Sequence, residues 1–114
     1  MTGCEPRLRA KIWVAATIRA CVANGTSATV ARRGDEDAGA ILIKQNFLNG
    51  RFVVLTQIRT ADGTQAWLRG TGPDPVGEDT ADAYIARQLV RDSDLWVIEI
   101  EDRDGRLPFG GSVL

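Results

Sequence analysis

The sequence predicts a small α+β domain in which a mostly antiparallel sheet carries two helices on one of its faces. Two dipeptides that favour two-residue hairpin turns, Asn49-Gly50 and Asp62-Gly63, separate runs rich in apolar and β-branched residues. Two further segments repeat apolar residues at helical spacing. The chain has 114 residues, of which 44% are hydrophobic and 25% charged, as expected for one globular domain.

The first third of the chain is expected to form a strand, a helix and a second strand. In residues 8–14 apolar and charged residues alternate, which predicts a strand with one polar face. Apolar residues then recur at helical spacing from Val14 to Val22, and Asn24-Gly25 is a typical helix end. Residues 26–33 regain the composition of a strand, and residues 34–39 form a polar loop.

The two hairpin turns predict a register for the middle of the sheet. A two-residue turn at Asn49-Gly50 pairs Phe47 with Phe52, and one at Asp62-Gly63 pairs Ile58 with Trp67. One face would then collect the apolar side chains of Ile41, Ile43, Phe47, Phe52, Val54, Ile58 and Trp67. The other face would carry Lys44, Asn46, Gln57 and Arg59.

The last third is expected to contain a loop, a helix, a strand and a tail. Residues 78–92 have acidic residues at their start, arginines at their end and an apolar stripe, which predicts a helix. Residues 95–101 alternate like a strand, and residues 105–114 form a flexible tail. The order is therefore β-α-β-β-β-β-α-β, within a single domain over residues 1–114.

Composition argues against several functional classes. Lys and Arg number 14 against 15 Asp and Glu, so the net charge of −1 provides no overall field for nucleic acid or an anionic membrane. The absence of His removes the commonest general base and metal ligand, and we expect no cofactor and no metal. Without a signal peptide or a membrane-spanning segment the chain is expected to be cytoplasmic, with Cys4 and Cys21 as free thiols.

Two charged clusters are the candidates for binding a ligand or a partner. The first is the arginine loop, residues 32–37. Its guanidinium pair, Arg32 and Arg33, suits a phosphate or a carboxylate, but the acidic residues that follow would neutralise this pair. The second is the acidic end of the last strand, where paired carboxylates would share an ion or pair with Arg7, Arg9 and Lys11 on the first strand. The candidate residues are Arg32, Arg33, Asp35, Asp37, Glu99, Glu101 and Asp102.

Several short segments are similar to a small bacterial family, domain of unknown function number 1491. They include Ile12-Trp13-Val14, Arg32-Arg33-Gly34-Asp35, Ala83-Tyr84-Ile85 and Asp94-Leu95-Trp96-Val97, and they occur in the same order over nearly the whole chain. The resemblance implies a stand-alone cytosolic protein. It implies no activity, substrate, cofactor or catalytic residue.

Three functional hypotheses follow. The first is a non-enzymatic binding or interaction module, a homodimer or the partner of another protein, that works through a sheet edge or face and the arginine loop. The second is a small enzyme with Glu99, Glu101 or Asp35 as acid or base and Arg32 or Arg33 as an anion clamp. The third, less favoured, is a nucleic-acid-binding protein that uses Lys44, Arg51 and Arg59 on the sheet.

Overall fold

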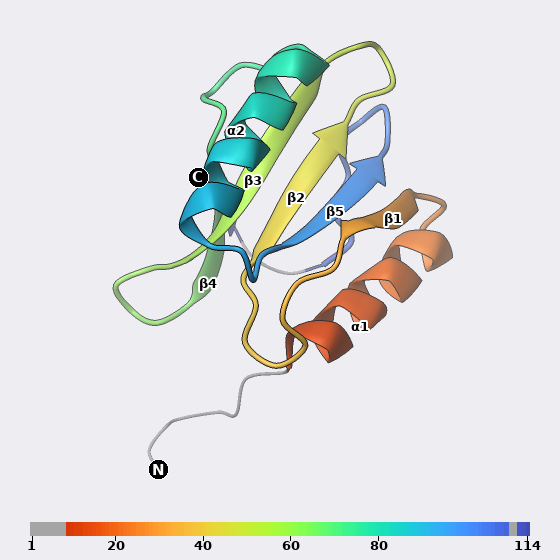
Figure 1. Ribbon diagram of the computed structural model, residues 1–114. Coiled ribbons are helices and arrows are strands. Elements are labelled where there is room, and N and C mark those ends of the chain that lie inside the picture. Colours follow the sequence, from red (N-terminus) through yellow and green to blue (C-terminus); the bar gives the residue numbers. More distant parts are fainter. Residues whose placement is uncertain (1–8, 110–111) are drawn as a thin grey trace.

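The computed structural model describes residues 9–109 and 112–114. Helices and strands follow one another as shown in Figure 1. In chain order they are α1 (Ala10–Ala23), β1 (Ser27–Arg32), β2 (Ile41–Asn46), β3 (Phe52–Arg59), β4 (Gln65–Arg69), α2 (Glu78–Arg91), β5 (Trp96–Glu101) and β6 (Ser112–Val113).

The described strands form one mixed sheet in the order β1-β5-β2-β3-β4-β6. The pairs β1–β5, β2–β3 and β3–β4 are antiparallel, whereas β2–β5 and β4–β6 are parallel. The prediction of a mostly antiparallel sheet is therefore wrong. Because α2 carries the chain back before β5 begins, β5 runs in the same direction as β4 and pairs in parallel with β2.

The predicted first strand is also wrong, because residues 10–14 belong to α1. No side chain caps the start of this helix. Instead, the amides of Ala10 and Lys11 donate to the main-chain carbonyls of Asp37 and Glu36, at 3.3 and 3.0 Å. The cap thus comes from a loop more than twenty residues away in the sequence, and the element order becomes α-β-β-β-β-α-β-β.

Both central hairpins exist, but each is shifted by one residue from the predicted register. Asn46 pairs with Phe52 across the first turn, and Trp67 pairs with Gln57 across the second. Each turn has three residues between its innermost hydrogen-bonded pair, with Gly50 and Gly63 at φ values of 83° and 82°. A three-residue turn that ends in a left-handed glycine shifts the pairing relative to a two-residue turn.

The helices pack on opposite faces of the sheet, so the prediction that they share a face is wrong. Val14 and Cys21 of α1 lie in a core with Ile43, Trp67 and other residues of the strands. On the opposite face, α2 forms a second core with Leu42, Phe52, Val54 and Val97. Figure 1 shows α2 in front of β3, while α1 lies beside β1 at the edge of the sheet. The one-residue register shift places Phe52 and Val54 on the face opposite Ile41 and Ile43, with which they were predicted to share a face.

Other predictions are confirmed. The second helix spans Glu78–Arg91 and buries Ala81 and Ile85, with Leu89 packed at the margin. The strand Trp96–Glu101 directs Trp96, Ile98 and Ile100 to the α1 core and Val97 to the α2 core. Within the described residues no helix is long and apolar enough to span a membrane.

Candidate functional site

The arginine loop folds against the start of β5. Arg32 donates from Nη1 to the main-chain oxygen of Leu95 at 2.8 Å, which ties β1 to the residue before β5. Arg33 pairs with Glu36 at 3.5 Å and lies over the Trp96 ring, 5.4 Å from its centroid. Both guanidinium groups therefore have partners within the fold.

The acidic residues of the same loop shape its backbone. The Asp35 carboxylate accepts hydrogen bonds from the amides of Asp37 and Ala38, at 3.1 and 2.8 Å, and the Asp35 carbonyl accepts one from the Trp96 indole at 2.7 Å. Asp37 pairs with Arg9 at 3.5 Å. The loop thus presents Glu36 and Asp37 to the start of α1, where the basic residues Lys11 and Arg9 meet them.

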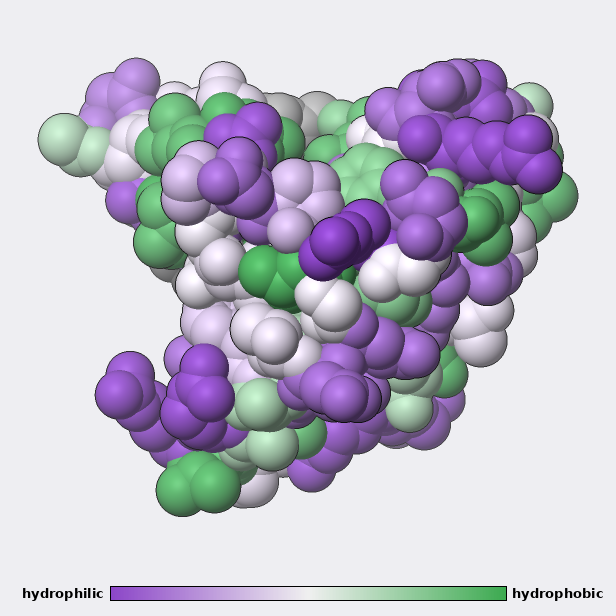
Figure 2. All heavy atoms as spheres, turned by 90° about the horizontal axis from the view of Figure 1, so that it is seen from above, coloured by the Kyte–Doolittle hydropathy of each residue, from purple (hydrophilic) through white to green (hydrophobic). Residues whose placement is uncertain are grey.

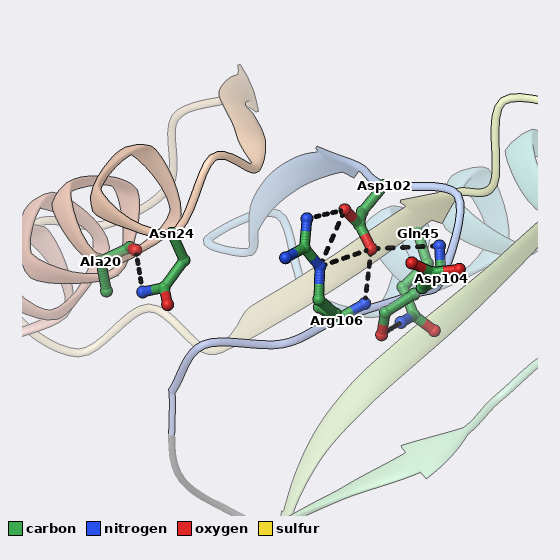
Figure 3. A network of polar contacts seen from close by, with 7 residues as sticks. Ala20, Asn24, Gln45, Asp102, Asp104 and Arg106 are labelled. Carbon is green, nitrogen blue, oxygen red and sulfur yellow. Dashed lines mark hydrogen bonds and ion pairs between the residues drawn. The ribbon is translucent and has the colours of Figure 1, made fainter.

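Asp102, at the other end of β5, holds a tight turn. Its buried carboxylate makes an ion pair with Arg106 at 2.8 Å and accepts hydrogen bonds from the amides of Asp104 and Arg106 (Figure 3). The hydrogen bonds from Arg106 and its charge lower the pKa of Asp102 to about 2. A carboxylate so fully occupied supports the turn rather than offering free ligand oxygens.

Glu99 belongs to a polar cluster centred on Lys44, a residue that was predicted to lie on the polar face of the sheet and to contribute to a nucleic-acid surface. The Lys44 side chain is 9% exposed, and its ammonium lies 2.8 Å from Asp82, 2.9 Å from Glu78 and 3.9 Å from Glu99. Glu99 also accepts a hydrogen bond from Asn46 at 3.0 Å. We call Lys44, Glu78, Asp82 and Glu99 the Lys44 cluster; it links β2 and β5 to the first turns of α2.

The Lys44 cluster keeps its lysine charged. Burial alone would lower the pKa of Lys44, but hydrogen bonds to Asp82 and Glu78 and the charges of Asp82 and Glu99 raise it above its ordinary value. A lysine held in its ammonium form is a poor nucleophile and a poor general base. The arrangement therefore suits an electrostatic contact that stabilises the packing of α2 on the sheet better than it suits covalent catalysis.

The structure does not gather the predicted site residues into one place. The arginine loop lies at the start of β5, where Arg32 is level with Val97, whereas Glu99, Glu101 and Asp102 follow toward the strand's end. The expected pairing of a basic first strand with Glu99 and Glu101 is wrong, since Arg9 directly precedes α1 and pairs with Asp37, and Lys11 lies within α1 and pairs with Glu36. Arg7 and Cys4 lie outside the described residues.

The proposed nucleic-acid surface is also divided. Lys44 lies beneath α2, whereas Arg59 borders the α1 face of the sheet beside Gln65. Cys21 is fully buried in the α1 core, and its burial raises the pKa of its thiol. Trp96 is buried in the same core, and the half-buried Trp13 packs against it.

One structural edge is more open than the rest. β1 pairs with β5 on one side, and the strand order places it at the end of the described sheet, beside α1. Most of the solvent-facing residues of α1 are apolar, which is unusual for a surface helix. The apolar ones are Ile12, Ala15, Ala16, Val22 and Ala23, and the charged ones are Lys11 and Arg19. Elsewhere, Figure 2 shows hydrophobic side chains in small groups among hydrophilic ones.

Comparisons with known proteins agree with this fold. A family model described as a protein of unknown function (DUF1491) matches residues 8–110. The crystal structure of a DUF1491 family protein from Caulobacter crescentus CB15 is 39% identical, with a TM-score of 0.83 over 95% of this chain and 100% of that one. An NMR structure of a DUF1491 family protein from the same organism is 39% identical, with a TM-score of 0.81 over 96% of this chain and 99% of that one.

A third solved structure is more distant. A protein from A. tumefaciens is 30% identical, with a TM-score of 0.65 over 84% of this chain and 86% of that one. No match was found among the curated proteins. The similarity therefore covers almost the whole length of the two Caulobacter crescentus proteins but carries no named activity.

Proposed function

The chain belongs to the DUF1491 family of proteins of unknown function, and we propose that it is a non-enzymatic interaction module that assembles as a homodimer through β1 and α1. The observation that carries this proposal is the outer edge of β1, which pairs with no second strand within residues 9–109 and 112–114, beside the mostly apolar outer side of α1. β1 contains a single charged residue, Arg32, and no proline or lysine. Natural edge strands usually carry such residues because they prevent pairing with another chain.

A second copy suits this edge better than an unrelated peptide does. Two β1 strands related by a two-fold axis pair antiparallel, so each strand supplies the hydrogen-bonding groups that the other needs. The same axis places both α1 helices on one face, where their apolar outer sides adjoin. A bulge between Val30 and Arg32 limits regular pairing to the first residues of β1, so the helices must contribute much of the buried surface.

An enzyme that uses carboxylates and arginines is less well supported. Such an enzyme would need its acid, base and anion clamp around one cleft. Arg32, Asp35 and Asp102 instead make hydrogen bonds that hold the fold, at opposite ends of β5.

The test measures the molar mass in solution by light scattering and sedimentation up to about 1 mM protein. We expect the unmodified chain to form a dimer. Val22→Lys should weaken this dimer, because the change places a charge on the outer side of α1. Val90→Lys is the matched control, since both valines are exposed on helices, at 67% and 88%, but Val90 lies on α2.

The proposal fails if the unmodified chain stays monomeric at that concentration. It also fails if V90K lowers the dimer affinity as much as V22K does. A dimer that is insensitive to V22K but sensitive to changes elsewhere would place the interface on another surface.

A further inference from the structure

We propose that a cleft on the α1 face of the sheet binds a small aromatic anion, either a carboxylate or a phosphate ester. The cleft has a volume of about 530 Å³ and lies between the start of α1, the loop of residues 37–40 and the ends of β3 and β4 that meet at the second hairpin. Sites for small organic molecules typically range from roughly 300 to 1,000 Å³. The space therefore suits one small molecule, and of the two charged clusters predicted from the sequence only Asp37 borders it.

The charged groups of the cleft favour an anion. Arg9 and Arg59 line it together with one carboxylate, Asp37, so that the lining has one more positive than negative side chain. Arg9 pairs with Asp37 at 3.5 Å, and both side chains are more than 70% exposed, which makes this a weak surface pair. Arg59 donates one hydrogen bond, to the Gly63 carbonyl at 2.6 Å. A guanidinium carries five N–H donors, so both arginines retain donors for an anionic ligand.

The remaining walls of the cleft favour a ring. Trp13 and Ile41 supply aromatic and apolar surface. The Trp13 indole is fixed by Trp67 and Phe109, whose ring centroids lie 5.7 and 5.5 Å away. An indole held in this way offers a preformed surface for a flat ligand.

Two amides are placed to orient the anionic group. Gln65 lies directly across from Arg59 in the β3–β4 pair, and Gln57 precedes Arg59 by two residues on the same face. Amide side chains both donate and accept, so they can complete the hydrogen bonds of a carboxylate or phosphate bound by the arginines. A cationic ligand would instead meet the net positive charge of the lining.

The experiment titrates the ¹⁵N-labelled full chain with benzoate and with phenyl phosphate, and follows the backbone amide signals by NMR. Benzamide, which keeps the ring without the charge, and acetate, which keeps the charge without the ring, serve as matched probes. We expect saturable binding of an aromatic anion, with the largest shifts in residues 38–41 and 57–59. Tighter binding of benzoate identifies a carboxylate as the ligand class, and tighter binding of phenyl phosphate identifies a phosphate ester.

Variants then locate the site. Arg59→Ala and Arg9→Ala should each weaken binding about tenfold, because each removes a charge-assisted interaction. Arg51→Ala is the matched control: Arg51 is exposed next to the opposite end of β3 and should leave the affinity unchanged. The proposal is overturned if neither anion binds saturably up to about 10 mM, if benzamide or acetate binds as tightly, or if R51A weakens binding as much as R59A.

Discussion

Lys44 is a charged residue that the fold buries, and its removal should be costly. In Lys44→Met, Glu78, Asp82 and Glu99 lose the cation that neutralises them. We expect the free energy of unfolding to fall by about 2 kcal/mol, less than for a fully buried ion pair because Glu78 and Asp82 remain half exposed. Urea denaturation at pH 7 measures this loss.

The control for K44M is Lys11→Met, which removes an exposed lysine paired with Glu36 at 3.8 Å. It should change the free energy of unfolding by less than about 0.5 kcal/mol. The raised pKa of Lys44 adds a second signature. Its stabilising contribution is present below the unfolded-state pKa of lysine and is lost as pH rises through the higher folded value, so wild type and K44M should converge in strongly alkaline solution. A K44M protein as stable as wild type at pH 7 would contradict this account.

Asp102 should give the opposite pH dependence. Its pKa is about 2 in the folded protein, below the ordinary value of 3.8. Its charge therefore stabilises the fold above pH 3.8, and this contribution is lost as pH falls through about 2. Asp102→Asn should be less stable than wild type at pH 7, and the difference should shrink between pH 4 and 2. Thermal unfolding of wild type and D102N across this pH range tests the prediction. The control is Asp74→Asn, which changes an exposed carboxylate. A stability difference between wild type and D102N that persists unchanged at pH 2 would refute the role of the charge.

The local composition around each candidate residue could be predicted, but its partners could not. The acidic residues beside Arg33 were expected to neutralise it, and Glu36 does so. The position of Lys44 beside Glu78 and Asp82 was not predictable, because those contacts depend on which face of the sheet α2 covers. A lysine within an apolar strand run such as Ile41–Asn46 is the signal that could have identified a buried cation.

At the scale of single elements, the arginine loop depends on glycine for its close approach to β5. A Cβ atom at Gly34 would overlap the main-chain carbonyl of Asp94 and the ring of Trp96. Gly34→Ala should therefore displace the loop, weaken both its cap on α1 and the β1–β5 pair, and lower the free energy of unfolding by about 2 kcal/mol.

Gly77→Ala is the control for G34A, because a Cβ atom at Gly77 meets no atom within 4 Å. It should leave stability within about 0.5 kcal/mol of wild type. Chemical denaturation compares the two, and amide exchange at Ala10 and Lys11 reports on the cap, since both amides donate to the loop. Equal stability of the two variants would show that the loop can move without loss.

The elements themselves were predictable where a local signal determines them. The helix Glu78–Arg91 has acidic residues in its first turn and an arginine in its last, and its stripe faces the sheet. The start of α1 lacks such a local signal, because its cap is the backbone of residues 36 and 37. The hairpins show an intermediate case: Asn49-Gly50 identified the turn, but the same dipeptide fits a turn one residue longer, and only packing on both faces selects the register.

At the scale of the whole molecule, the error in topology has a recognisable cause. Ile41–Leu42–Ile43 and Phe52–Leu55 are continuous apolar runs rather than alternating ones, and every residue of these runs is buried. Such runs are typical of strands covered on both faces. Had these continuous runs been given more weight than the hairpin register, they would have predicted one helix on each face of the sheet and a central position for β2 and β3.

The C-terminal residues complete the α1 core, which makes the stability of the whole molecule depend on them. Phe109 packs edge-on against Trp13 and Trp67, and the Leu114 amide donates to the Trp67 carbonyl at 2.7 Å beside the short β4–β6 pair. Phe109→Ala should lower the free energy of unfolding by about 2 kcal/mol and speed amide exchange at Leu114, because it opens a gap beside both indoles. Leu68→Ala, which trims an exposed leucine of the same strand β4, should do neither. If F109A unfolds like wild type while exchange at Leu114 accelerates, the last residues pack on the core without stabilising it, and the α1 core is held by the helix and the sheet alone.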